Sequence, residues 1–357
     1  MAPVIRELAG HQDRVRSVVC VTGQHREMLD QVLGLFDIQP DYDLNIMRPD
    51  QALSQLTADI FTRLDPVVKE IRPDWILAQG DTTTVLVAAL VAYYHRVPFG
   101  HVEAGLRTGD RFRPFPEEVN RRIADSLADL LFAPTERARQ ALLREGCPED
   151  RILVTGNTVI DALLAVAAQP YDWSNGPLAG IPNDLRLILI TAHRRESFGS
   201  PLREICLAIR ELAMKFSSDG VHFVYPVHLN PNVRRPVLEI LSGLPNVSLP
   251  EPLDYLSFVH LMKRSALILT DSGGIQEEAP SLGVPVLVMR ETTERPEAIT
   301  SGVARLVGTE RRRIMEEATR LLTDADAYAA MTRGMNPYGD GKAAKRIVSA
   351  LLKRTRA

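Results

Sequence analysis

A turn of small residues followed by two acids carries the most chemical information in this chain. The apolar run Leu267–Thr270 leads into Asp271–Gly274, and the pattern predicts a helix that opens near Ile275 with Glu277 and Glu278 in its first turn. Such a turn lets phosphates approach backbone N–H groups at the positive end of the helix dipole. Acids there partly cancel that dipole, so Glu278 suits a ribose hydroxyl better than a phosphate. Simple helix capping is the alternative. The candidates for binding a nucleotide diphosphate are Ser272, Gly273 and Gly274.

Two carboxylates follow predicted strands in the first half of the chain. Asp81 comes after the run Trp75–Ala78, and Glu103 comes directly after Phe99–Val102. Residues at the carboxyl ends of parallel strands face the crevice in which ligands bind. Asp81 could instead cap the helix that follows it. Glu103 has apolar neighbours and no local helix to cap. Burial there would raise its pKa and suit it to carry a proton, with an ion pair to Arg107 as the alternative.

A third acidic position opens the next predicted helix. Pro116 precedes Glu117 and Glu118, and Arg121 follows about one turn later. Acids in a first helical turn commonly complement the dipole, which is the structural explanation. The functional one is that Glu117 adds a third carboxylate to the crevice, beside Arg121. Several carboxylates favour proton abstraction and donation, since neither a Gly-x-Ser-x-Gly elbow nor a Cys–His arrangement is present.

Histidines and arginines follow strands in the second half. His228 precedes the tight turn that begins at Asn230, which would hold it at the sheet edge as a ligand-binding or acid–base residue. His193 and Arg194 follow the strand that ends at Thr191 and are placed to contact a diphosphate. Arg295 could serve the same purpose. The alternatives are a structural histidine and a solvated charge run.

Length and composition indicate a soluble globular protein of two domains and give no reason to expect nucleic acid or a membrane as partner. The 357 residues are too many for one ordinary core, 45% are hydrophobic, and the formal net charge is −3. No apolar run has the length of a membrane span, and the start has no signal-peptide layout. Three widely spaced cysteines show no metal-site spacing and are expected to be reduced thiols in the cytoplasm. We therefore expect no metal, no nucleic acid and no membrane partner.

Apolar runs and helical periodicity alternate along almost the whole chain, which predicts parallel sheets covered by helices. The run 168–184 is rich in Pro, Gly and Asn and is expected to link two domains. We predict a Rossmann-like domain at 1–168, a second, nucleotide-binding one at 182–340, and a terminal helix at 341–357 that returns to the first. The expected strands are Val18–Val21, Trp75–Ala78, Phe99–Val102, Leu131–Ala133, Ile152–Val154, Leu185–Thr191, His222–Val227, Val247–Leu249, Leu267–Thr270 and Val284–Met289.

The start of the chain departs from this alternation. Residues 1–8 already show a helical pattern, and the first strand is expected only at Val18. A doubly wound domain usually opens with a strand and a loop that feeds its first helix. We therefore expect that an opening strand and loop precede Met1 in related proteins.

With these residues assembled, the chain resembles the non-hydrolysing UDP-N-acetylglucosamine 2-epimerases from Met1 to about Leu352. The resemblance rests on many ordered motifs over the whole length. They are TGQHREMLDQVL (22–33), QGDTTT (79–84), HVEAGLRT (101–108), PEEVNR (116–121), TGNTVID (155–161), AHRRES (192–197), YPVHLNPNV (225–233), TDSGGIQEEAPSLGVPVLVMR (270–290), TTERPE (292–297) and NPYGDG (336–341).

The resemblance implies two Rossmann-like doubly wound domains that face a cleft, in a glycosyltransferase-B-like arrangement, and usually a homodimer. It implies interconversion of UDP-GlcNAc and UDP-ManNAc without NAD or metal. UDP is eliminated across C1–C2 to leave 2-acetamidoglucal, and then adds back with the proton delivered to the opposite face.

The motif matches also imply roles for individual residues. Asp81, Glu103 and Glu117 correspond to the acid–base set, with Arg121 beside them and His228 near the phosphates. Phe258 corresponds to the uracil region and Arg295 to the sugar or phosphates. Gln24 and His25 match a motif at a second, regulatory site for UDP-GlcNAc.

The family's N-terminal strand and Gly-Thr-Arg-Pro-Glu-Ala-Ile-Lys loop have no match in this chain, so the loop's Arg and Lys cannot be carried over. Three alternatives to the epimerase remain. They are a hydrolysing epimerase that releases ManNAc and UDP, a glycosyltransferase of similar architecture, and an inactive binder of UDP-sugars.

Overall fold

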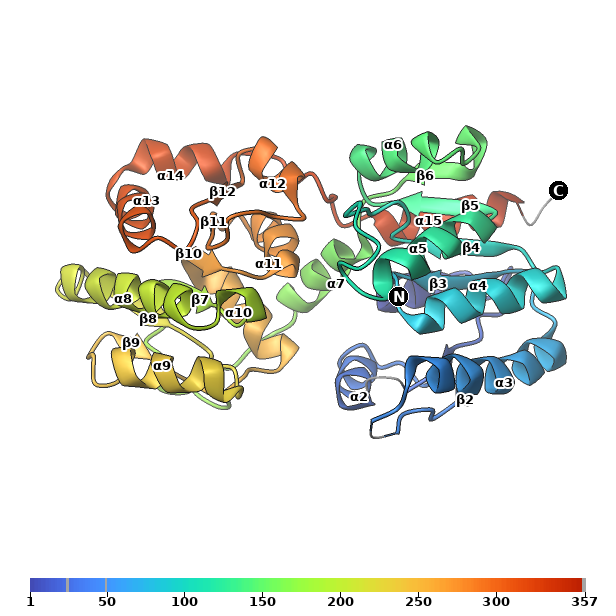
Figure 1. The fold of residues 1–357 in the computed structure, drawn as a ribbon, viewed down its shortest axis with the longest axis horizontal. Coiled ribbons are helices and arrows are strands. Elements are labelled where there is room, and N and C mark those ends of the chain that lie inside the picture. The colour runs from blue at the N-terminus through green and yellow to red at the C-terminus, as the bar shows by residue number, and fades with distance from the viewer. Residues whose placement is uncertain (24–25, 49, 355–357) are drawn as a thin grey trace. The chain divides into compact units, whose positions relative to one another are not determined.

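Parallel strands separated by helices form two units of the chain. The computed structural model describes residues 1–23, 26–48 and 50–354 (Figure 1). One unit comprises residues 1–162 and the C-terminal segment that begins at Tyr338, and the other comprises residues 163–337. Neighbouring strands in both units run parallel. This confirms the prediction of Rossmann-like α/β structure in both halves of the chain.

The N-terminal unit contains a four-stranded sheet of β3 (Ile76–Gln79), β4 (Phe99–Val102), β5 (Leu130–Ala133) and β6 (Ile152–Val154), hydrogen-bonded in that order. Every residue of β4 and β5 is buried, because helices cover both faces of a parallel sheet. A separate two-stranded ladder pairs β1 (Cys20–Val21) with β2 (Tyr42–Asp43).

The helices of this unit include one that is apolar on nearly every side. α4 buries Val85, Val87 and Val91, because it packs against the sheet and against both α3 and α5. The helix bounds are α1 (Ala2–Ala9), α2 (Arg26–Leu35), α3 (Leu53–Ile71), α4 (Thr83–His95), α5 (Glu117–Leu127), α6 (Glu136–Arg144), the 3-10 turn η1 (Glu149–Arg151), α7 (Thr158–Ala167) and α15 (Ala343–Arg354).

The terminal helix α15 completes the core of the N-terminal unit. Ile347 and Val348 of α15 lie in one buried cluster with Val4 of α1 and Phe132 of β5. The C-terminal segment therefore folds with the first residues of the chain.

The C-terminal unit has a six-stranded parallel sheet in the order β12-β11-β10-β7-β8-β9. The first strand in sequence, β7, lies at the centre between β10 and β8, so the connections reverse direction there. This is the strand order of dinucleotide-binding folds, and ligands bind at such a reversal outside the carboxyl ends of the strands. The strand bounds are β7 (Arg186–Thr191), β8 (Val221–Val224), β9 (Val247–Ser248), β10 (Ser265–Thr270), β11 (Val286–Val288) and β12 (Ala304–Leu306).

Helices lie between successive strands of this unit in the sequence, as in a doubly wound sheet. No helix in the described part of the chain is long and apolar enough to cross a membrane. The bounds are η2 (Arg195–Ser197), α8 (Ser200–Lys215), α9 (Pro231–Leu241), α10 (Tyr255–Arg264), α11 (Gly273–Glu278), η3 (Ala279–Leu282), α12 (Pro296–Thr300), α13 (Arg311–Thr323) and α14 (Ala325–Thr332).

The boundary between the units differs from the one expected at residue 168. It falls inside α7, between Ala162 and Leu163. The Pro- and Gly-rich run that follows α7 belongs to the C-terminal unit, because the Tyr171 ring stacks 4.8 Å from His260 and Leu178 is fully buried. Sequence composition predicted a linker where the chain forms an irregular, largely exposed segment that is anchored to the C-terminal unit by the buried Leu178 and Ile181.

Candidate functional site

Glu103 is held by amide side chains at the carboxyl ends of β3 and β6. Its two carboxylate oxygens accept hydrogen bonds from Gln79 Nε2 at 3.2 Å and from Asn157 Nδ2 at 3.4 Å. Its backbone has a φ of 67°, in the left-handed region that only a tight turn imposes on glutamate. The alternative ion pair with Arg107 is wrong, because Arg107 Nη2 donates to Asp125 instead, at 2.7 Å.

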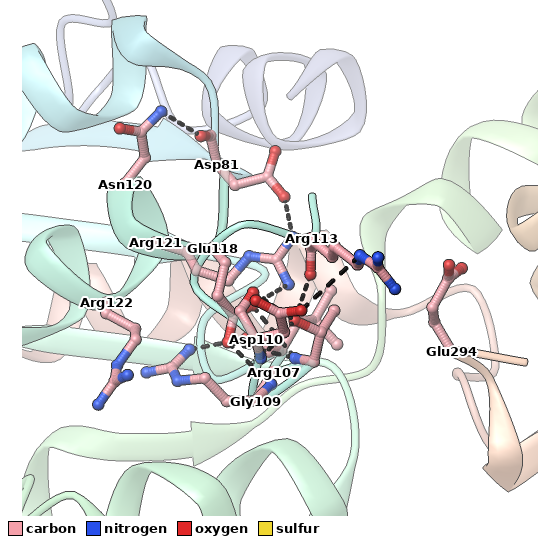
Figure 2. Close-up of polar contacts among 12 residues, drawn as sticks. Asp81, Arg107, Gly109, Asp110, Arg113, Glu118, Asn120, Arg121, Arg122 and Glu294 are labelled. Carbon is pink, nitrogen blue, oxygen red and sulfur yellow. Dashed lines mark hydrogen bonds and ion pairs between the residues drawn. The ribbon is translucent and has the colours of Figure 1, made fainter. Parts of the chain in front are cut away.

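Asp81 lies on the neighbouring turn and does not cap a helix. The N-cap of α4 is Thr82. The Asp81 carboxylate accepts a hydrogen bond from Arg121, and its backbone oxygen accepts one from Asn120 Nδ2 at 2.9 Å (Figure 2). The start of α5 therefore holds Asp81 in place while 30% of its side chain stays exposed.

The paired acids at the start of α5 differ in their surroundings. Glu118 is fully buried, accepts hydrogen bonds from Thr108 N and Gly109 N, and pairs with Arg121 at 3.3 Å (Figure 2). Glu117 has a buried oxygen, Oε2, with no hydrogen-bond partner among the described residues. A buried carboxylate oxygen left without a partner is costly, which favours a ligand-facing role for Glu117 over helix capping.

A buried ion-pair network beneath these turns was missed by the sequence analysis. His101 Nδ1 lies 2.6 Å from Asp125 Oδ1, and Asp125 also accepts from Arg107. The signal was present in α5, whose pattern is inverted. Val119 and Ile123 are exposed on this helix while Glu118, Arg121 and Asp125 are buried. Charges on the buried face of a helix must be paired, so the inversion itself predicts a network.

In the C-terminal unit, Asp271 fixes the loop after β7 at the reversal of the strand order. Its side chain is fully buried, and Oδ2 accepts hydrogen bonds from His193 N and Arg194 N, each at 2.8 Å. Arg194 Nε in turn donates to the Asp271 backbone oxygen at 3.1 Å. The Gly273 Cα lies beside that guanidinium, since a Cβ there would be 3.5 Å from Arg194 Nη2. The two loops that sequence analysis assigned to a diphosphate therefore meet.

The expected start of the helix after this turn was wrong. α11 begins at Gly273, not near Ile275, so Glu277 and Glu278 are its last residues and not its first turn. The N–H groups of Gly273 and Gly274 thus open the helix, and the acids do not weaken its positive end. Glycine adds no apolar side chain to the helical pattern, so the pattern begins only at Ile275, two residues after the helix itself.

Glu278 is a buried carboxyl next to a tyrosine hydroxyl. It is 8% exposed, and Tyr255 Oη donates to its Oε1 at 2.8 Å. Burial, opposed by the Tyr255 hydrogen bond and reinforced by the charge of Glu277, raises the pKa of Glu278 from 4.5 to about 7. The group can therefore change its charge near neutral pH.

Glu278→Gln is expected to raise Tm at pH 8 and to leave it nearly unchanged at pH 5. The Glu278 carboxyl holds its proton more tightly in the folded state than in the unfolded state, where it is released above pH 4.5. The free energy of unfolding of the wild type therefore falls as the pH rises from about 4.5 through about 7. The ionised buried carboxylate costs on the order of 2–3 kcal/mol at pH 8, which a neutral amide avoids. Thermal unfolding should show a gain of roughly 5–10 °C. Glu251→Gln, at an exposed position, should change neither value, and an equal gain for Glu278→Gln at both pH values would contradict the assignment.

Two histidines stack at the carboxyl ends of β7 and β8. The rings of His193 and His228 lie 5.3 Å apart with an interplanar angle of 17°. His228 Nδ1 accepts a hydrogen bond from Asn230 N at 3.1 Å, which leaves Nε2 as the protonated nitrogen when the ring is neutral. Burial, with a contribution from His228, lowers the pKa of His193, although the charge of Asp271 opposes the shift.

The remaining candidate residues are Arg295, Phe258, Gln24 and His25. The Arg295 guanidinium binds the buried carboxylate of Glu277. A ligand that contacts Arg295 would share the guanidinium with this carboxylate. Phe258 is half-buried on α10, one turn after the Asp254 N-cap. Gln24 and His25 lie outside the described residues.

The described residues contain neither a metal-type cluster nor a candidate residue in their main groove. No group of three or more His, Cys, Asp or Glu side chains in 1–23, 26–48 and 50–354 could hold a metal ion. A groove of about 620 Å³ lies between β6 and α15, and its lining contains none of the candidate residues.

The fold and these residues are those of a two-unit Rossmann-like α/β enzyme. One unit carries carboxylates at its strand ends, and in the other Asp271 joins two loops at the reversal of the strand order. Residues 6–352 match the family model described as UDP-N-acetylglucosamine 2-epimerase. The UDP-N-acetylglucosamine 2-epimerases of Yersinia pestis and Escherichia coli K12 are 57% and 56% identical to this chain, over 98% of it and 94% of each relative. The chain belongs to the UDP-N-acetylglucosamine 2-epimerase family, which confirms the resemblance predicted from the motifs.

Solved structures agree. The Neisseria meningitidis UDP-GlcNAc 2-epimerase bound to UDP-GlcNAc superposes with a TM-score of 0.86 at 50% identity, and the match covers 99% of this chain and 96% of that one. The S. aureus MnaA–UDP co-structure gives a TM-score of 0.86 at 44% identity and covers 100% and 93%.

Proposed function

We propose that the protein interconverts UDP-N-acetylglucosamine and UDP-N-acetylmannosamine by inversion at C2, to supply cell-surface polysaccharide synthesis. The observation that carries the proposal is the set of carboxylates in the N-terminal unit. Asp81 and Glu103 follow adjacent parallel strands, and Glu117 begins the helix whose Arg121 binds Asp81. Family membership supplies the substrate, because the matched N. meningitidis enzyme was solved with UDP-GlcNAc.

The proposed reaction is an elimination followed by an addition. One carboxylate removes the C2 proton, the C1–oxygen bond breaks, UDP leaves with the bonding electrons, and C1 and C2 become doubly bonded in 2-acetamidoglucal. A second group then protonates C2 from the opposite face, and a UDP oxygen re-forms the bond to C1. Substrate and product have the same oxidation state, so the sequence balances without a redox partner. Inversion requires proton-transfer groups on both faces of the ring, which accounts for several carboxylates.

UDP is proposed to bind the C-terminal unit. The N–H groups of Gly273 and Gly274, the Ser272 hydroxyl, the His193 ring and the Arg194 guanidinium suit the diphosphate. The Ser272 N–H donates to Thr270 Oγ1 at 2.9 Å, and Asp271 holds the two loops together. Glu278 suits the ribose hydroxyls, which would favour its ionised form. The further assignments are Phe258 to the uracil, Arg295 to the sugar or phosphates, and His228 to acid–base chemistry near the leaving oxygen.

Product analysis tests this function. Incubation with UDP-GlcNAc alone, followed by chromatography, should give an equilibrium mixture of both UDP-sugars. Free ManNAc and UDP without UDP-ManNAc would indicate a hydrolysing epimerase. Turnover only after a sugar acceptor is added would indicate a glycosyltransferase. Thermal stabilisation by UDP-GlcNAc without any product would indicate a binder.

We also propose that the protein is a homodimer in the cytoplasm. Tyr93 and Tyr94 of α4 are 64% and 63% exposed, and Val119 and Ile123 of the adjoining α5 are 38% and 37% exposed. Large apolar side chains exposed on two neighbouring helices favour an interface between subunits. All three cysteines are free thiols, which suits a reducing compartment.

Tyr94→Asp combined with Ile123→Asp is expected to convert the dimer to a monomer. Each subunit would bury two carboxylates in a symmetric interface, where desolvation and the accumulated like charge both oppose association. Light scattering after size exclusion should report half the wild-type mass. Met214→Asp, at a 59% exposed position in α8, should leave the mass unchanged. A double variant that still elutes as a dimer would place the interface elsewhere.

A further inference from the structure

His101 and Asp125 form an ion pair that is shielded from solvent. Their side chains are 0% and 1% exposed. His101 Nδ1 lies 2.6 Å from Asp125 Oδ1, and His101 Nε2 lies 2.7 Å from the backbone oxygen of Gly80. The pair thus joins three elements, because His101 is on β4, Gly80 follows β3 and Asp125 is on α5.

The partners of His101 define its protonation state. A backbone carbonyl oxygen only accepts hydrogen bonds, and so does an ionised carboxylate. Both ring nitrogens must therefore donate, which requires the positively charged imidazolium. A neutral ring would leave one nitrogen lone pair facing an oxygen lone pair inside a buried site, at a cost that a satisfied network avoids.

The charged groups around the ring support this state. Burial alone lowers the pKa of His101, but the charge and hydrogen bond of Asp125, with a contribution from Glu103, raise it overall. Burial likewise opposes ionisation of Asp125, while His101 and Arg107 lower its pKa. Arg107, the second cation that contacts Asp125, also binds the Glu145 carboxylate at 2.7 Å. The positive charge of Arg107 is therefore balanced by Glu145 as well as by Asp125.

The same pair holds the backbone on both sides of Glu103 and directly before Asp81. Glu103 lies between His101 and Gly105, and Gly105 N donates to Asp125 Oδ2 at 3.2 Å. Gly80, which accepts from His101, immediately precedes Asp81 in the chain. One imidazolium–carboxylate pair therefore fixes both turns that carry the strand-end carboxylates.

We propose that His101 and Asp125 are positioning residues, which as a permanently charged pair set the spacing of Asp81 and Glu103 and do not themselves transfer the substrate proton. The proposal rests on the proposed epimerase function for its effect on turnover. Its claim about protonation stands independently of substrate. Misplacement of a catalytic group by about 1 Å can lower a rate by about 100-fold, so a residue that acts only through position can have a large effect.

Nitrogen NMR of wild-type protein labelled with ¹⁵N-histidine tests the protonation state. At pH 8 an ordinary histidine with a pKa near 6.5 is about 97% neutral. One histidine is expected to show two protonated ring nitrogens at this pH, and its signal should be absent from His101→Gln. A neutral His101 at pH 8 would overturn the proposal. This result does not depend on turnover, so it remains valid if the protein fails to epimerise UDP-GlcNAc.

Asp125→Asn tests the positioning role. Its amide can donate to Nδ1 of a neutral His101, so the side chain keeps its shape and loses its charge. We expect kcat to fall about 10- to 100-fold and the Kd for UDP to change less than about twofold. The NMR signal of His101 should become that of a neutral ring at pH 8.

Asp129→Asn is the matched control. Asp129 Oδ2 accepts a hydrogen bond from Phe99 N at 2.9 Å and so anchors the opposite end of the same strand. It should leave kcat within about twofold of wild type. Equal losses of kcat in both variants would reduce the pair to general structural support, and full turnover in Asp125→Asn would overturn positioning. If Asp125→Asn does not fold, the wild-type NMR measurement still decides whether the pair is charged.

Discussion

Glu103→Gln is expected to lower kcat for UDP-GlcNAc epimerisation by roughly 10²- to 10⁴-fold, the usual contribution of a general acid or base. The amide has the shape of the carboxylate, and its oxygen can still accept a hydrogen bond from Gln79 or Asn157. It cannot accept the substrate proton. The Kd for UDP, measured by calorimetry, should stay within about twofold of wild type because the proposed UDP site lies in the other unit.

A surface glutamate of the same unit provides the control for this change. Glu149 is 72% exposed and pairs only with Arg139 among the interactions that the structure records. Glu149→Gln should keep wild-type kcat. Near-normal turnover in Glu103→Gln, or a loss that appears only in KM, would remove Glu103 from the acid–base set.

Asp81→Asn is expected to lower kcat by about 100-fold or more, with little change in Tm. The substitution removes the proton-transfer oxygen and also the charge that balances Arg121, whose other carboxylate partner is the buried Glu118. Because Asn120 binds the backbone oxygen and not the side chain of Asp81, the turn itself should be retained. Stopped assays with UDP-GlcNAc would give kcat, and calorimetry would give the Tm.

Asp74→Asn, at an exposed position before β3, should affect neither quantity. If Asp81→Asn instead unfolds the N-terminal unit at a temperature well below wild type, the Asp81–Arg121 pair is structural and the catalytic assignment fails. A loss of kcat at unchanged Tm supports the assignment.

Much of the fold follows from short apolar runs. The expected strands around Phe99, Leu131 and Leu187 are present because parallel strands buried on both faces need uninterrupted apolar residues. The strand at Ile152 is also present, as an apolar edge strand of its sheet. β2 and β12 were not predicted, since Tyr42–Asp43 and Ala304–Leu306 are short and carry charged residues. Periodicity cannot distinguish such edge strands from loops.

The candidate site was only partly accessible from sequence. Motifs located the acids, but Glu117 and Glu118 are adjacent and chemically identical. Only their surroundings in the structure distinguish the buried Glu117 oxygen without a hydrogen-bond partner from the Glu118 carboxylate that anchors a loop. The pairing of Arg107 with Asp125 joins residues 18 positions apart and depends on how α5 packs against β4. No local pattern specifies that packing. The start of α11 at Gly273 was missed for a local reason. An apolar pattern does not detect a glycine in a helix.

The origin of the C2 hydrogen in the product tests the elimination mechanism most directly. UDP-GlcNAc would be converted in deuterated water, and the UDP-ManNAc formed would be examined by NMR and mass spectrometry, with the quenched enzyme searched for 2-acetamidoglucal. Removal and delivery on opposite faces by different groups predict nearly complete deuteration at C2, together with detectable glucal. UDP-ManNAc that keeps the original hydrogen at C2, with no glucal, would contradict proton transfer by these carboxylates.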